Sequence, residues 1–64
     1  MTPTRLLACL AALRWSNRDA AAAFGYDEAS VRQWLAGRTR IPEHVAAWME
    51  KAARWMEKNP PPPR

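Results

Sequence analysis

The stretch SNRDAAAAFGYDEASVRQWLAG, residues 16–37, decides the fold because it contains the signals for two short helices and the turn between them. Ser16 can cap the first helix with its hydroxyl, and Asp19, three positions later, completes a capping-box pair. Alanines follow, which lose no side-chain entropy in a helix. Gly25 then suits the left-handed conformation that ends a helix. The pattern predicts a helix over residues 17–24.

The second helix of this stretch has one apolar and one polar face. Asp27 can cap it and Gly37 can end it, which predicts a helix over residues 28–36. Three apolar residues share one face at helical spacing: Val31, Trp34 and Leu35. The opposite face carries charged, amide and small side chains: Glu28, Ala29, Arg32, Gln33 and Ala36. A carboxylate, a guanidinium and an amide are able to hydrogen-bond base edges in the major groove of DNA.

Two helices joined by a glycine-containing turn form the helix-turn-helix pattern, and this stretch resembles the Cro/CI, or Xre-like, family of phage and bacterial regulators. The resemblance rests on a series of capping, small, apolar and glycine residues: Ser16, Asn17, Ala21, Phe24, Gly25, Tyr26, Asp27, Val31, Trp34 and Gly37. Two positions depart from the family pattern, since Ala20 replaces the usual Leu and Leu35 a frequent Glu. The close match covers about a third of the chain, and the flanking helices extend it less specifically.

The resemblance implies an all-α fold, a small four-helix bundle with a lambda-repressor-like helix-turn-helix. It also implies a sequence-specific regulator of transcription that binds double-stranded DNA, as a homodimeric repressor or autorepressor on an inverted-repeat operator. Small stand-alone members are often associated with phages or mobile elements. Cro-like repressors, antitoxins and regulators of anti-CRISPR operons are all compatible. By the same resemblance, the base-reading positions are Glu28, Ala29, Ser30, Arg32 and Gln33.

The predicted helix over residues 28–36, which carries the base-reading positions, is called the reading helix. Five residues near it are suited to hold the DNA backbone: Asn17, Arg18, Arg38, Thr39 and Arg40. The first two begin a helix, where free backbone amides favour a phosphate. The other three form a loop directly after the reading helix, and such loops commonly contact the DNA backbone. A solvated connecting loop is the alternative interpretation. Either Arg32 or Gln33 can also hold a phosphate instead of a base.

Length and charge are those of one small basic domain, with 64 residues and a net charge of +4. Domains of this kind commonly meet nucleic acid or an anionic membrane, and a solvated surface is the plainer alternative. No apolar run approaches the roughly 20 residues that span a membrane. Arg14 interrupts the apolar N-terminal stretch and no cleavage site fits after it. We therefore expect a first helix, not a signal peptide, and a cytoplasmic protein, bacterial or phage-encoded and nucleoid-associated.

The N-terminal segment predicts a helix over residues 3–14, capped by Thr2. Its apolar stripe is expected to contain Leu6, Leu7, Cys9, Leu10, Ala11 and Leu13. Cys9, the single cysteine, is expected to be a small core residue, because no second cysteine or basic pair supports a disulfide or a reactive thiol. Trp15 is expected in the core or as a hydrophobic staple on the next helix, with stacking on bases as the alternative.

The C-terminal segment predicts a long helix over residues 42–58, preceded by Ile41 in the core. Its apolar residues form a heptad-like stripe: Val45, Trp48, Met49, Ala52, Trp55 and Met56. The second half of this helix would project past so small a bundle, which indicates a dimer seam. The seam is expected at Trp48, Ala52, Trp55 and Met56, with folding back onto the first helix as the alternative. An ion pair between Glu50 and Arg54 is expected on the outer face.

Residues that would support catalysis are not grouped in this sequence. His44 is a lone histidine, expected at the surface, and there is no glycine-rich phosphate loop. We expect no catalytic residue, no metal, no cofactor and no small-molecule ligand. Residues 1–58 are expected to form the DNA-binding domain with its dimerisation helix. The tail at 59–64 is expected to be proline-rich and flexible.

A second function remains open from the sequence alone. The chain can instead be a protein-interaction module that keeps a helix-turn-helix scaffold and presents the Trp48 and Trp55 helix to a partner. DNA binding that is absent or insensitive to salt would favour that alternative.

Overall fold

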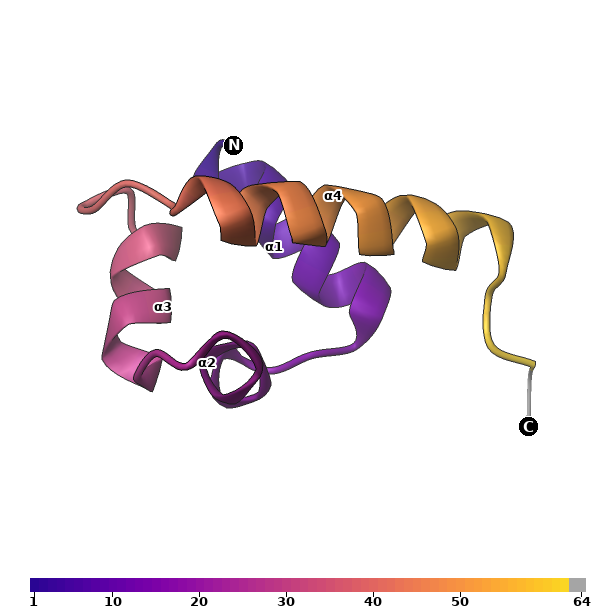
Figure 1. The fold of residues 1–64 in the computed structure, drawn as a ribbon, viewed down its shortest axis with the longest axis horizontal. Helices are drawn as coiled ribbons and strands as arrows, with labels where there is room; N and C mark the ends of the chain where they lie inside the picture. Colours follow the sequence, from indigo (N-terminus) through magenta and orange to yellow (C-terminus); the bar gives the residue numbers. More distant parts are fainter. Residues whose placement is uncertain (63–64) are drawn as a thin grey trace.

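The chain forms four α-helices in a computed structural model that describes residues 1–62. Their bounds are Pro3–Leu13 for α1, Asn17–Phe24 for α2, Glu28–Leu35 for α3 and Glu43–Lys58 for α4. Residues 1–62 contain no strand. α1 packs against α4 and α3, and α2 packs against α3, while α4 extends past the other helices toward the C-terminus (Figure 1). The expected all-helical fold is confirmed, and each helix end lies within one residue of its prediction.

The first three helices begin at the side-chain caps that the sequence predicts. The hydroxyl of Thr2 accepts from the backbone N–H of Arg5 at 3.1 Å. Ser16 and Asp19 form a reciprocal capping box, with bonds of 2.9 and 3.1 Å between each side chain and the other residue's backbone N–H. Asp27 accepts from the first turn of α3 at 2.8 Å. These bonds satisfy amide groups that a helix start leaves without partners.

A residue in the left-handed conformation follows each of the first three helices. Gly25 (φ 76°) follows α2 and Gly37 (φ 75°) stands just beyond α3, where the sequence predicts them. The third such residue is Arg14 (φ 59°), so α1 ends one residue earlier than expected. This conformation lets the Trp15 N–H donate to the Leu10 carbonyl at 2.9 Å, a bond typical of helix ends with a left-handed residue.

The core lies between the helices, and within residues 1–62 it contains eleven buried hydrophobic residues: Leu6, Cys9, Leu10, Ala20, Ala21, Val31, Trp34, Ile41, Val45, Met49 and Ala53. Cys9 and Ile41 are buried as predicted, and burial raises the pKa of the Cys9 thiol, which favours its protonated form. The expected wide stripe on α1 is wrong at two positions. Leu7 is 60% exposed and Ala11 is exposed, because they lie on the side of α1 that no other helix covers.

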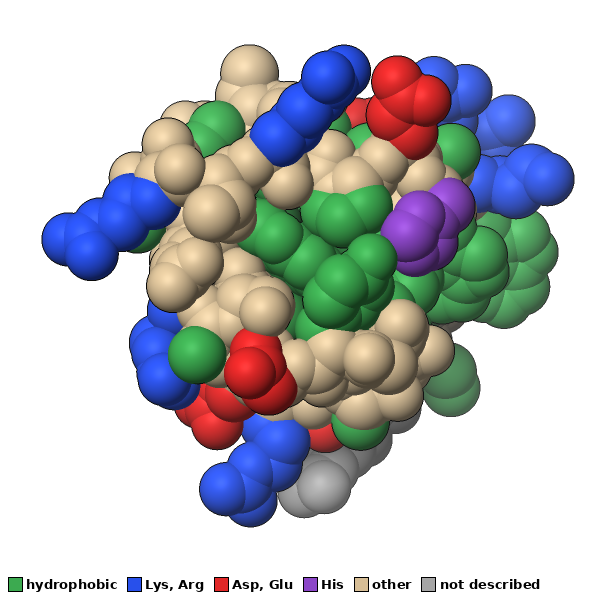
Figure 2. Space-filling view, turned by 60° about the vertical axis from the view of Figure 1, so that its left-hand side comes forward, with side chains coloured by type: hydrophobic (Ala, Val, Ile, Leu, Met, Phe, Trp, Pro, Cys, Tyr) green, Lys and Arg blue, Asp and Glu red, His purple; other side chains and the backbone are tan. Residues whose placement is uncertain are grey.

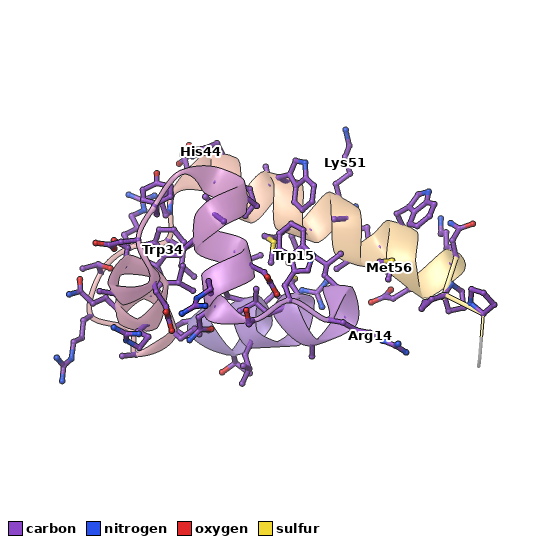
Figure 3. All side chains as sticks on the ribbon, turned by 90° about the horizontal axis from the view of Figure 1, so that it is seen from below. Arg14, Trp15, Trp34, His44, Lys51 and Met56 are labelled. Carbon is purple, nitrogen blue, oxygen red and sulfur yellow. The ribbon has the colours of Figure 1, made fainter. Side chains whose placement is uncertain are left out.

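An aromatic cluster joins α2 and α4 through the linker residue Trp15. The Trp15 ring is stacked on Trp48 at 5.4 Å between centroids and meets Phe24 edge-on at 6.3 Å. Trp48 also meets Phe24 edge-on at 5.5 Å, and Figure 3 shows Trp15 directed toward α4. Trp15 is partly buried against the core, which confirms its expected core position. Its aromatic partners are Phe24 and Trp48, at the far end of α2 and on α4.

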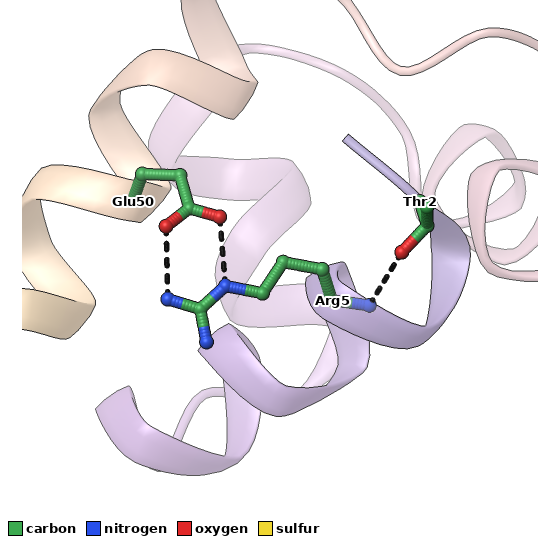
Figure 4. A network of polar contacts seen from close by, with 3 residues as sticks. All are labelled: Thr2, Arg5 and Glu50. Carbon is green, nitrogen blue, oxygen red and sulfur yellow. Dashed lines mark hydrogen bonds and ion pairs between the residues drawn. The ribbon is translucent and has the colours of Figure 1, made fainter.

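A bidentate ion pair between Arg5 and Glu50 joins α1 to α4 (Figure 4). Arg5 Nε lies 2.7 Å from Glu50 Oε1, and its terminal nitrogen lies 2.8 Å from Oε2. The expected pair of Glu50 with Arg54 is therefore wrong, since the Glu50 carboxylate points across to α1. The hydrogen bonds from Arg5 lower the pKa of the Glu50 carboxyl. Planar two-point contacts of this kind fix geometry as well as charge.

The left-handed conformation of Arg14 generates a stability prediction. Replacing Arg14 by Gly should give a protein about 1 kcal/mol more stable than the Arg14→Ala variant, because a Cβ is strained at positive φ and glycine is not. Both variants remove the same charge, so their difference isolates the backbone effect. Urea denaturation of the two variants measures it. Equal stabilities would show that this residue leaves the left-handed conformation in solution.

The Arg5–Glu50 pair generates a pH prediction. The pKa of Glu50 is lowered from its ordinary value of 4.5 in the folded chain. The pair therefore stabilises the fold fully above about pH 4.5, and this contribution is lost as the pH falls through the folded pKa. The Glu50→Gln variant should be less stable than the parent at pH 7, and the gap should close in acid. Thermal unfolding from pH 7 to pH 2 measures the gap, with Glu57→Gln as a control on the same helix. A gap that stays constant with pH contradicts the prediction.

Candidate functional site

The α3 helix has a buried face and an exposed face, as its sequence predicts. Val31 is fully buried and Trp34 is 4% exposed, while Leu35 is partly buried against the core. The opposite face exposes Ala29, Arg32, Gln33 and Ala36 to solvent. Because the buried face ties the helix to α1 and α2, the exposed side chains are held on a fixed support.

A hollow of about 310 Å³ lies on the exposed face of α3. It is lined by Ala29, Arg32, Gln33, Ala36 and Arg38. The two alanines leave room on the helix surface, and the guanidinium and amide groups stand around it. The structure therefore brings three of the predicted base readers together with the first residue of the predicted phosphate loop. Asn17 and Arg18 begin α2 and do not line this hollow.

An ion pair on the surface of α3 joins Arg32 to another predicted base reader, Glu28. Glu28 Oε1 and Arg32 Nη1 lie 3.1 Å apart, with side chains 43% and 59% exposed. Pairs at this spacing on an exposed helix contribute only about 0.2–0.5 kcal/mol. A ligand acceptor of similar geometry can therefore replace Glu28 as the partner of Arg32. The spacing of Glu28 and Arg32, four residues apart on a helix, permits this pair, whereas the sequence prediction gives both residues partners on DNA.

Ser30 is the predicted base reader whose hydroxyl already has a local partner. Its Oγ donates to Asp27 Oδ1 at 2.6 Å, and its backbone N–H donates to the same oxygen at 2.8 Å. Ser30 is half-buried. These two bonds, chiefly the one from the hydroxyl, lower the pKa of Asp27. Ser30 therefore belongs to the cap that fixes the start of α3, and its hydroxyl is less available than Arg32 or Gln33.

The loop after α3 presents the predicted phosphate residues Arg38, Thr39 and Arg40 to solvent. Arg40 lies 3.5 Å from Glu43, in a pair whose side chains are almost fully exposed. The loop lines a second hollow of about 240 Å³ together with the N-terminal residues Met1 and Pro3. Sequence reasoning did not find this neighbour, because only the packing of α1 against α3 brings the chain start to the loop.

Tyr26 supports the turn between α2 and α3 from outside. Its ring meets Trp34 edge-on at 4.9 Å and stacks on His44 at 6.2 Å, and its hydroxyl lies 3.5 Å from His44 Nε2. His44 is exposed, as predicted. Figure 2 shows it beside hydrophobic side chains in the middle of this face, with Lys and Arg side chains around the edge. No local pattern predicts this contact, since it joins the turn to the first turn of α4.

The predicted seam residues lie along α4 between Trp48 and Met56. Trp48 is 45% exposed and Trp55 is 61% exposed, while Ala52 and Met56 are half-buried. All four line an apolar groove of about 430 Å³, to which Leu13 also contributes. The groove is separate from the hollow on α3, with which it shares no lining residue.

Comparison of the chain with protein-family models, curated protein sequences and solved structures found no match. Among the described residues, no group of three or more His, Cys, Asp or Glu side chains could hold a metal ion. No helix within residues 1–62 is both long and apolar enough to cross a membrane. The geometry of α3 and its neighbouring loop is therefore the feature from which a function can be argued.

Proposed function

We propose that this chain is a sequence-specific regulator that binds double-stranded DNA through a helix-turn-helix formed by α2 and α3. The observation that carries the proposal is the exposed face of α3, where Arg32, Gln33 and Arg38 surround a hollow floored by alanines. Arginine and glutamine are the side chains that bind guanine and adenine through paired hydrogen bonds. A basic chain with net charge +4 supplies the attraction to the phosphate backbone.

The dimensions of α3 suit the major groove. Eight residues make a helix about 12 Å long, and the major groove of B-form DNA is about 12 Å wide and admits a helix. Its buried face, at Val31 and Trp34, leaves the reading face directed outward. Small residues at Ala29 and Ala36 allow the helix surface to approach the bases closely.

Each reading side chain has a preferred base in this proposal. Arg32 takes a guanine and Gln33 an adenine, each through two hydrogen bonds, and Ala29 meets at most a thymine methyl. When Arg32 leaves Glu28 to bind a guanine, the Glu28 carboxylate becomes free to accept a hydrogen bond from a cytosine amino group. In the free protein these two residues pair at 3.1 Å, so their pairing is what DNA binding would replace.

The flanking residues position the domain without reading sequence. Arg38, Thr39 and Arg40 extend from the loop beside α3 and can meet the DNA backbone. Asn17 and Arg18 stand at the start of α2, where unpaired amides favour a phosphate. A homodimer would place two α3 helices in successive major grooves, about 34 Å apart, on an inverted repeat. Such a dimer would repress by covering a promoter, in the cytoplasm of a bacterial cell.

A second candidate function is a protein-interaction module that uses α4. The observation that favours it is the exposure of Trp55 beside the apolar groove of α4. Solvent-exposed aromatic surface of this kind marks interaction sites. This candidate requires no DNA binding, so the response of binding to salt separates it from the first.

Binding to random duplex DNA in a salt series tests the proposal directly. Affinity should fall steeply as salt rises, because protein contacts with phosphates release counterions. The Arg38→Ala variant should lower the slope of log K against log salt by about 1. Arg54→Ala removes an exposed charge from α4 and is the matched control, with an unchanged slope expected. No binding at low salt would refute the proposal and favour the protein-interaction module.

Operator selection from a randomised duplex library tests the reading roles. Replacing Arg32 and Gln33 by Ala should cost about 1–3 kcal/mol of discrimination for each lost paired contact, and should relax preference at the corresponding base pairs. The same selection with the Arg38→Ala variant is the control, because a phosphate contact weakens all sequences alike. An unchanged sequence preference in the double variant would remove α3 from its assigned role.

A further inference from the structure

We infer that the apolar groove on α4 is occupied by a second copy of this chain, with Trp55 of each copy inserted into the groove of the other. The inference rests on the proposed function for its biological purpose, since it names the surface that would build the homodimer. Its physical basis is separate and lies in the shape and exposure of the groove residues.

The groove is apolar along almost all of its length. It has a volume of about 430 Å³ and is lined by Leu13, Trp48, Lys51, Ala52, Trp55 and Met56. Lys51 is the one charged lining residue among the described part of the chain, and in Figure 3 it points away from the other helices. A ligand that fills this groove must therefore be a bulky apolar group.

Trp55 is a bulky apolar side chain that the helices of its own chain do not bury. Trp48 stacks on Trp15 and contacts Phe24, and it still keeps 45% of its surface exposed. Trp55 takes part in no aromatic contact within residues 1–62 and is 61% exposed. Exposed indole surface in water is unfavourable, and burial of a Trp is a leading contribution to interfaces.

The groove and Trp55 lie next to each other, which makes the surface self-complementary. In a two-fold dimer the same patch meets itself, so residue i contacts residue j and j contacts i. Trp55 is 61% exposed and lines the groove together with the small Ala52, so one patch offers both a bulky group and a space for one. In the proposed dimer, a two-fold axis near Ala52 would let the Trp55 indole of each copy enter the groove of the other. Both Trp55 side chains would then be covered at once.

The two exposed tryptophans supply about half of the area that a small dimer needs. Taking a Trp side chain as about 250 Å², Trp48 and Trp55 together expose roughly 260 Å² in each copy. Two copies would therefore supply about half of the roughly 1,000 Å² that a specific interface buries. The stem of Lys51 and the half-buried Leu13 and Met56 extend the apolar centre, and the charged residues of α4 form a polar rim.

The position of the groove leaves the reading helix free. Figure 1 shows α3 at one end of the molecule and the C-terminal half of α4 toward the other. Two α3 helices spaced about 34 Å apart would each lie about 17 Å from the two-fold axis. The molecule extends 35 Å along its longest axis, which leaves room for about 17 Å between α3 and the two-fold axis.

The test measures the mass of the protein by sedimentation equilibrium without DNA. The protein concentration runs from about 1 micromolar to about 1 millimolar, which covers the dissociation constants of moderate and weak complexes. The parent chain should reach twice the monomer mass. Trp55→Ala should raise the dimer dissociation constant by about 30-fold or more, because each dimer loses two buried indoles. Leu7→Ala is the matched control, since Leu7 is equally exposed but lies on α1 outside the groove. Circular dichroism checks that both variants stay folded.

A mixing experiment tests the reciprocal geometry. The Ala52→Arg variant fills the groove but keeps its Trp55, whereas Trp55→Ala lacks the indole but keeps the other five residues that line the groove. Each variant alone should be largely monomeric. A mixture of the two should form heterodimers, because one intact indole then meets one groove that is not filled. Absence of heterodimers under these conditions would overturn the reciprocal insertion.

The outcomes separate this inference from the proposed function. If the parent chain stays monomeric at about 1 millimolar, a concentration at which even weak complexes form, the inference is overturned. The partner of the groove would then be another protein. A dimer that is unaffected by Trp55→Ala overturns it as well. A dimer that depends on Trp55 but binds no DNA supports the inference while refuting the proposed function. Loss of the dimer on deletion of residues 60–64, with Trp55→Ala without effect, would assign the groove to the proline tail.

Discussion

The burial of one face of α3 is the constraint on which the rest of the structure depends. Val31 is fully buried and Trp34 is 4% exposed, and these two side chains fix the rotation of the helix about its axis. Tyr26 packs edge-on against Trp34 at 4.9 Å and covers it from the turn. A rotation of α3 that exposed Trp34 would bury the guanidinium of Arg32, which is strongly unfavourable without a partner. The apolar face thus determines where the polar face points.

The ends of the helices could be predicted because their signals are local. Capping needs a hydroxyl or carboxylate within three residues of a free amide, and Ser16 and Asp27 supply them in the sequence itself. The stops at Gly25 and Gly37 follow from the ease with which glycine adopts positive φ. Arg14 escaped prediction because an arginine adopts this conformation only when the surrounding packing imposes it.

Contacts between distant segments could not be predicted from patterns along the chain. The pairing of Glu50 with Arg5 depends on where α1 crosses α4, and the local alternative at Arg54 had equally good helical spacing. The predicted burial of Leu7 was wrong for the same reason, because periodicity identifies an apolar stripe but not how much of it the neighbouring helices cover. The exposed polar face of α3 was visible in the sequence, whereas the hollow shared with Arg38 required the direction of the loop.

The two exposed tryptophans of α4 show how little core a chain of this length can build. Val45, Met49 and Ala53 of α4 already fill the space above α1, and each is at most 1% exposed. Trp48 reaches its partners only by stacking at the edge of this core, and Trp55, two turns further along, passes beyond it. A chain of this size buries only about 60% of the surface that it exposes when unfolded, so additional apolar residues must be covered from outside. One half of α4 packs in the core, and the other half would pack against a second copy. Folding of the chain and formation of the dimer would therefore be coupled. Dimer formation would then stabilise the same α4 that packs against α1, and through α1 it would stabilise α3.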